Sequence, residues 1–390
     1  MRTSWMGSFE RPAPRALLRS LLTLLVMAAL GAGVPAHAQV TPAAGYTPPD
    51  DTPSIKFGTV IYTDYTWTDE PEVLDVNGEP VDPGAFNVTR AYINVTGNIN
   101  HLISFRITPD ITRQTVTGTG VTLSDQESLV FRMKYAFGQF NLDQAWNSKG
   151  SWARLGAQQT PYVAWMEDIY RYRFQGTIGV EREGYLSSSD FGLSTHYNFP
   201  GNYGDVHGGY YNGETYARAE VNDQKGIQIR ATLRPAPMVS WLRGLRLTAF
   251  YVDDHYARDD PRKRALAAIT YEQKYVTVGA EYIEAIDQTS DAVNRVRSKT
   301  LSVWATPKLG KGWELLLRHD ATKPSEDIDG SRWRNIGGVA YWFPTQAPTA
   351  QAALLLDYEH VSNDVDLTTG TPPLRRPDET RYALHALFQF

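Results

Sequence analysis

The chain has 390 residues, 42% of them hydrophobic and 21% charged, a balance that excludes a disordered or collagen-like protein. Because it contains no cysteine, disulfide frameworks and cysteine-ligated zinc or iron–sulfur sites are excluded, and no other cofactor or metal is predicted. A formal net charge of -5 argues against a nucleic-acid-binding protein. A mean hydropathy of -0.38, with no long apolar run after residue 38, excludes a helical membrane protein.

The first 38 residues have the layout of a secretory signal peptide. Four arginines within the first 19 positions precede an apolar stretch over residues 21–34, and Ala36 and Ala38 form a small-residue cleavage pattern. A membrane anchor is the alternative, but the apolar stretch is short for a membrane span. We therefore predict a cleaved signal peptide over residues 1–38 and a short N-terminal lead over residues 39–54.

Beyond the lead, apolar and polar residues alternate with a period of two. In residues 226–234 the apolar face comprises Ile227, Ile229, Ala231 and Leu233. In residues 129–138 the predicted apolar face comprises Leu129, Phe131, Met133, Tyr135 and Phe137. Because successive side chains of a strand point to opposite faces, each such segment predicts a strand with one apolar and one polar face.

About sixteen segments of this kind follow one another to the end of the chain, each about long enough to cross a bilayer at a tilt. They begin near Ile55, Val88, Leu102, Ser128, Ser151, Ser189, Tyr203, Gly226, Gly244, Arg264, Tyr275, Ser298, Trp313, Arg332, Gln351 and Thr380. Tight connections, as at residues 273–274, alternate with long polar ones, as at residues 253–263 and 361–379. This pattern predicts an all-β fold, a single transmembrane antiparallel β-barrel of about 16 strands over residues 55–390.

A soluble β-sandwich or propeller would also show alternating strands. Aromatic residues near the predicted strand ends, among them Tyr65, Trp67 and Tyr341, favour the membrane barrel because interfacial girdles require them there. The barrel must close, since an unpaired backbone group in lipid is very costly. The predicted location is the bacterial outer membrane, in contact with outer-membrane lipid and lipopolysaccharide.

The last segment ends on an aromatic residue that is in phase with others. Tyr382, Phe388 and Phe390 share its apolar face, and this ending resembles the C-terminal signal of bacterial outer-membrane proteins. An ordinary edge strand is the alternative. The resemblance implies that the barrel-assembly machinery recognises these residues.

Two stretches resemble strand pairs of a known porin family. They are residues 90–97 with the turn that follows, and residues 154–161 with Glu167, Asp168 and residues 185–192 after them. These stretches are similar to the phosphate-selective porin O and P family. The resemblance implies a homotrimer of barrels of the predicted strand number, each with its third loop folded inward. This chain departs from the family because acids stand beside bases in the constriction.

By this resemblance, residues 161–186 form the inward-folding loop. Its charged residues are then the pore constriction: Glu167, Asp168, Arg171 and Arg173. Opposed charges across a narrow eyelet would orient permeating solutes, and the size of the loop would set the size limit. The alternative is an outward loop whose charges are solvated.

Basic residues outnumber acidic ones on the polar strand faces. Those in phase with the lumen include Arg90, Arg106, Arg132, Lys134, Arg154, Arg230, Arg318 and Arg381. A basic lumen lowers the entry barrier for anions. The alternative is that these cations pair with lumen acids and only keep the interior rigid. The sequence predicts a porin for passive diffusion of small hydrophilic solutes, with a mild preference for phosphate-like anions.

An outer-membrane β-barrel enzyme such as a lipid hydrolase is the alternative class. Such an enzyme needs a nucleophile and a base within hydrogen-bond reach. The sequence contains neither a G-x-S-x-G elbow nor an H-E-x-x-H pair, so we predict a protein that is not an enzyme.

Overall fold

The computed structural model describes residues 51–113, 128–220, 222–346, 349–365 and 375–390. The predicted signal peptide and residues 39–50 of the lead lie outside these ranges. Within the described ranges, no helix has both the length and the apolar character needed to cross a membrane.

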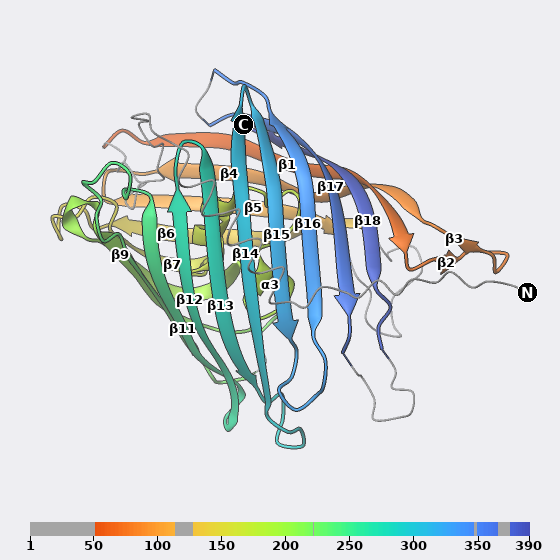
Figure 1. Cartoon of the computed structure of the whole chain (residues 1–390). Coiled ribbons are helices and arrows are strands. Elements are labelled where there is room, and N and C mark those ends of the chain that lie inside the picture. Colours follow the sequence, from red (N-terminus) through yellow and green to blue (C-terminus); the bar gives the residue numbers. More distant parts are fainter. Residues whose placement is uncertain (1–50, 114–127, 221, 347–348, 366–374) are drawn as a thin grey trace, which may run out of the picture. The chain divides into compact units, whose positions relative to one another are not determined.

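Sixteen antiparallel strands close into a barrel, which confirms the predicted fold class (Figure 1). The barrel strands are β1 (Ser54–Glu70), β4 (Gly84–Asn98), β5 (Ile103–Arg113), β6 (Leu129–Asn141), β7 (Trp152–Gln159), β8 (Ser189–Asn198), β9 (Gly204–Tyr211), β10 (Gly226–Leu233), β11 (Leu245–Ala257), β12 (Asp260–Glu272), β13 (Val276–Asp287), β14 (Val296–Gly310), β15 (Trp313–Lys323), β16 (Arg332–Trp342), β17 (Gln351–Asn363) and β18 (Glu379–Gln389). Each strand pairs with its neighbours in chain order.

Smaller elements lie in the connections between these strands. A short hairpin of β2 (Val73–Leu74) and β3 (Pro80–Val81) follows β1, and the 3-10 helix η2 (Pro200–Asn202) joins β8 to β9. The connection from β7 to β8 holds two helices, α2 (Val163–Tyr170) and α3 (Gly179–Arg182). Of these, α3 lies against β14 (Figure 1).

The first and last strands close the barrel. Val60 lies opposite Gln389 in the antiparallel pairing of β1 with β18. One step further, Thr59 and Phe390 exchange both backbone hydrogen bonds, each 2.9 Å long. The pairing therefore leaves no open sheet edge between the first and last strands, as a barrel in lipid requires.

The alternation of faces follows the sequence in most strands. In β10, Ile227 and Ile229 are exposed on the outer face, whereas Arg230 and Thr232 are buried toward the interior. In β18, the exposed side chains of Tyr382, Leu384 and Phe388 alternate with buried ones in the same way. The outer face is therefore apolar and the inner face carries the polar side chains.

Aromatic side chains gather on the outer face near both ends of the strands. Trp67 stacks on Tyr382 with ring centroids 5.4 Å apart at one end, and Trp313 packs on Tyr341 with centroids 4.9 Å apart at the other. These two groups stand where the girdles of a membrane barrel are expected.

A β-bulge interrupts the pairing of β5 with β6. Thr108 lies opposite Tyr135, but Pro109 lies opposite Met133, so Lys134 is an extra residue in β6. A proline fits such a point because it has no backbone N–H to give to the ladder. An extra residue shifts the side-chain alternation by one position, and all later residues of the strand change face.

The bulge overturns part of the predicted apolar face of β6. Leu129, Phe131 and Met133 are exposed on the outer face as predicted. Tyr135 and Phe137, which follow the bulge, instead point into the barrel and are only 6% and 7% exposed. The prediction was wrong for these two residues because sequence alternation alone does not reveal the extra residue.

Short turns and long connections do not alternate strictly, since residues 142–151 and 234–244 are long connections at the same end of the barrel as the tight turns. The turns at residues 99–102, 273–275 and 311–312 lie at the end that also holds Phe390, which we call the short-turn rim. The predicted long loop over residues 253–263 was wrong. There β11 and β12 extend as a hairpin and leave only residues 258–259 between them.

Candidate functional site

Residues 160–188, between β7 and β8, run inside the barrel and dock on the opposite wall. The Tyr162 hydroxyl donates a hydrogen bond to Glu281 on β13 at 2.6 Å. The Tyr172 hydroxyl donates to Glu314 on β15 at 3.0 Å. Because all four side chains are buried, these contacts hold the segment, which we call the inner loop, against β13 and β15.

A second set of polar contacts surrounds one carboxylate of β17. Glu359 accepts hydrogen bonds from Gln175 and Arg182 of the inner loop, both at 3.0 Å. It also pairs with two arginines of neighbouring strands, Arg381 at 2.5 Å and Arg334. Glu359 is only 2% exposed, so this ion cluster joins the inner loop to β16, β17 and β18 in a water-poor environment.

An apolar core fills the space between the inner loop and the wall that it contacts. Its buried members include Met166, Ile169 and Val180 from the loop and Phe250, Ile283, Leu316 and Leu355 from the strands. The sequence predictions did not include this core. The sequence does contain a feature from which this core could have been predicted. Residues 315–317 and 353–356 are continuous apolar runs, which indicate strands that are apolar on both faces.

The side of α2 away from this core faces an open space. A cavity of ≈ 310 Å³ lies between α2 and strands β1, β4, β5 and β6. The inner loop contributes Glu167, Asp168 and Arg173, and the strands contribute Arg106 and Lys134. The structure therefore brings three of the four predicted constriction residues to one cavity, opposite two of the predicted lumen cations.

Arg171, the fourth predicted constriction residue, does not line this cavity. It ends α2 in the left-handed conformation, with φ 64°, and the chain turns back there. Its guanidinium lies 4.2 Å from the centre of the Trp342 ring and 3.6 Å from Glu314. Arg171 thus belongs to the docked side of the inner loop, away from the cavity that the other three predicted constriction residues line.

The same turn brings Arg173 back beside Glu167. Arg173 Nε lies 2.5 Å from Glu167 Oε1, and both side chains are mostly buried. Burial raises the pKa of Glu167 to about 7, although Arg173 acts in the opposite direction. Asp168, the next residue, is exposed to the cavity and faces Arg106.

The cations on the facing wall rest on aromatic rings. Lys134 lies 4.6 Å from the centre of the Tyr92 ring, and Arg106 lies 4.6 Å from that of Tyr135. Arg106 donates hydrogen bonds to two neutral groups, Asn94 at 2.7 Å and Thr108 at 3.0 Å. In the part of the chain that the structure describes, no carboxylate forms an ion pair with Lys134 or Arg106.

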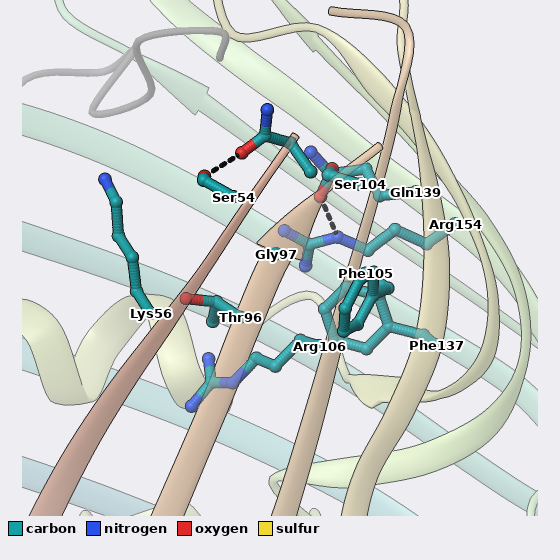
Figure 2. Close-up of a pocket in the computed structure, with 11 residues that line it drawn as sticks. Ser54, Lys56, Thr96, Gly97, Ser104, Phe105, Arg106, Phe137, Gln139 and Arg154 are labelled. Atoms are coloured by element: carbon teal, nitrogen blue, oxygen red, sulfur yellow. Dashed lines mark hydrogen bonds between the residues drawn. The ribbon is translucent and has the colours of Figure 1, made fainter. Parts of the chain in front are cut away.

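A second cavity of ≈ 310 Å³ continues toward the short-turn rim. Figure 2 shows Lys56, Arg106 and Arg154 around it, from β1, β5 and β7 respectively. Arg154 donates to the amide oxygen of Gln139 at 2.7 Å, and its guanidinium lies 3.7 Å from the centre of the Trp152 ring. Arg106 lines both cavities.

The other predicted lumen cations all face the interior but are paired with acids. The pairs are Arg90 and Arg132 with Asp110, Arg230 with Asp205, Arg318 with Asp320, and Arg381 with Glu359. For Arg230 and Arg318 the structural alternative fits, since each lies beside its own carboxylate. Asp110 is shared by two arginines and Glu359 by three, so these two clusters are held by ion pairs but keep a net positive charge. Lys134 and Arg106, in contrast, lie where the open space is.

The inner loop and the wall contain many acids and several histidines, but they are dispersed. Among the residues that the structure describes, no three or more His, Asp or Glu side chains are grouped so as to hold a metal ion.

Comparisons with known proteins agree with this architecture. No family model and no curated protein matches the sequence. OmpT of Vibrio cholerae, an outer membrane protein in trimer form, is 13% identical with a TM-score of 0.55, over 87% of this chain and 100% of that one. The anion-selective porin from Comamonas acidovorans is 11% identical with a TM-score of 0.59, over 87% and 100%. OmpF of Salmonella typhi, in complex with daunomycin, is 14% identical with a TM-score of 0.55, over 86% and 97%. At these identities the likeness concerns the fold, and the chain has the fold of the outer-membrane porins.

Proposed function

We propose that the protein is an outer-membrane porin through which small hydrophilic solutes diffuse, with a preference for anions. The observation that carries this proposal is the pair of cavities that share Arg106 in their linings inside a closed, externally apolar barrel. The inner loop fills the lumen against β13–β17 and leaves the space beside β1 and β4–β7 open. Solutes therefore pass along the wall that carries Lys134, Arg106 and Arg154.

The charges along this path favour anions. Lys134 and Arg106 have no carboxylate in ion-pair distance among the described residues, whereas the negative charge of Glu167 is balanced by Arg173. Asp168 is the exposed acid that faces them. In a narrow path with low-dielectric walls such an excess of positive charge raises the local concentration of anions. The opposed acid and bases also create a transverse field that orients dipolar solutes.

The remaining parts of the proposal follow from the porin fold. The chain forms a homotrimer in the bacterial outer membrane, among outer-membrane lipid and lipopolysaccharide, with the short-turn rim toward the periplasm. The barrel-assembly machinery recognises its C-terminal aromatic residues, Tyr382, Phe388 and Phe390. The trimer form of Vibrio OmpT and the anion selectivity of the Comamonas porin support these assignments. A phosphate-like solute and membership of the O and P family remain proposals from the sequence resemblance.

Ion selectivity in planar bilayers tests the function. We expect stepwise currents and an anion-selective reversal potential under a salt gradient. The selectivity should weaken at high salt, because the Debye length is only about 3 Å at 1 M. Hydrolytic activity without currents would favour the barrel hydrolase instead.

Substitutions of the unpaired cations test the path. Arg106→Gln and Lys134→Gln should each shift the reversal potential toward cations, since each removes one positive charge from the cavity wall. Arg295→Gln is the matched control, because Arg295 is exposed in the connection between β13 and β14. Equal shifts from all three variants would contradict a path along this wall.

A further inference from the structure

Glu167 lies between a base and a second acid. The Arg173 guanidinium contacts it at 2.5 Å, and the carboxyl of Glu181 on α3 lies near enough to act on it as a second negative charge. Glu167 and Arg173 both line the open cavity, so a change in the charge of Glu167 acts directly on the path.

The strands packed against α2 present further groups to Glu167. Lys134 of β6 faces it across the cavity, with Tyr62 of β1 and Tyr135 of β6 beside it, and Asp168 follows it on α2. The mostly buried side chain of Glu167 has little contact with water, which is the main cause of its raised pKa, and Glu181 acts in the same direction. Its charge thus changes near neutral pH.

Resting on the proposed porin function, we propose that protonation of Glu167 switches the passage to a stronger anion preference. A neutral Glu167 no longer balances Arg173, so the positive charge of Arg173 acts on the cavity together with Lys134 and Arg106. The cavity lining then carries one negatively charged side chain, Asp168, instead of two. Protonation therefore changes the ion selectivity of the path and does not close it.

The test is the anion-to-cation permeability ratio of the reconstituted protein between roughly pH 5.5 and pH 8.5. We expect the ratio to rise at least about twofold on acidification of the wild type. Glu167→Gln should have a raised ratio and lose the part of the step near pH 7. Burial inside the barrel also raises the pKa of Asp168, to about 6, so Asp168→Asn is the matched comparison: it removes the neighbouring charge and should keep the part of the step near pH 7.

The outcomes separate this inference from the proposed function. A wild type without currents contradicts the porin function itself. Currents with a pH-independent ratio, or a Glu167→Gln variant that keeps the part of the step near pH 7, overturn only the switch. Asp168 also changes charge within this range, so the comparison of the two variants is decisive.

A second variant tests the influence of the neighbouring acid. Glu181→Gln removes a carboxyl that raises the pKa of Glu167, so the step should move to lower pH. An unmoved step would show that Glu181 does not act on the charge of Glu167.

Discussion

At the scale of single residues, close contacts decide how the inner loop docks. Gly179 begins α3, and a Cβ atom at this position would lie 2.7 Å from Ser302 Cβ and 3.2 Å from Glu281 Oε1. Both neighbours belong to strands and are buried, so neither can move freely. The absence of a side chain at Gly179 therefore allows α3 to lie on β14.

Gly179→Ala should destabilise the docked loop, because overpacking costs about 1–3 kcal/mol. We expect a lower unfolding temperature in detergent and noisier single-channel currents. Gly337→Ala is the control, since a Cβ there meets nothing within 4 Å. Equal effects of the two substitutions would show that the contact of Gly179 with the wall is unimportant.

At the scale of elements, the inner loop and the β5–β6 bulge together define the path. The loop occupies the side of the lumen where strands are apolar on both faces, and the bulge turns Tyr135 and Phe137 inward on the other side. These rings then support Arg106 and Arg154, at 4.6 Å from ring centre to guanidinium in both cases. The position of the open space therefore depends on both elements.

Glu359→Gln should release the inner loop from β16–β18. The substitution leaves Arg182, Arg334 and Arg381 without their shared carboxylate, and breaking a buried ion cluster costs about 3–5 kcal/mol. We expect faster proteolysis of the loop and a larger, fluctuating conductance. Glu326→Gln, in an exposed pair with Lys299, should cost at most about 1 kcal/mol. Quiet, wild-type currents from Glu359→Gln would contradict this role.

At the scale of the whole molecule, closure makes every strand depend on the first and the last. Thr59 and Phe390 form the final pair of backbone hydrogen bonds between β1 and β18. The Phe390 ring is 74% exposed on the outside, where the proposed assembly signal would be accessible. The backbone of Phe390 thus helps to close the barrel between β1 and β18, while its exposed ring is available for recognition during assembly.

Deletion of Phe390 should reduce the yield of folded barrel more than Phe390→Ala, because only the deletion removes both backbone hydrogen bonds. The heat-modifiable fraction on gels measures the folded barrel, both after refolding in detergent and after expression in cells. Phe390→Ala should impair assembly in cells only. Phe343→Ala, which removes another exposed aromatic ring, is the control. Wild-type yield from the deletion would contradict a role in closure.

The sequence by itself determined the strands, their number and most of their faces, because alternation is local and each strand must show lipid an apolar face. It also placed Glu167, Asp168 and Arg173 together, since the three lie within one short segment. Only the tertiary structure decided which lumen cations are paired with acids and which line the open path. Most of those pairings join residues of neighbouring strands, such as Arg381 of β18 opposite Glu359 of β17, so they depend on the strand register. The bulge at Lys134 and the docked position of Arg171 were likewise decided by contacts between elements, which no local pattern of side chains records.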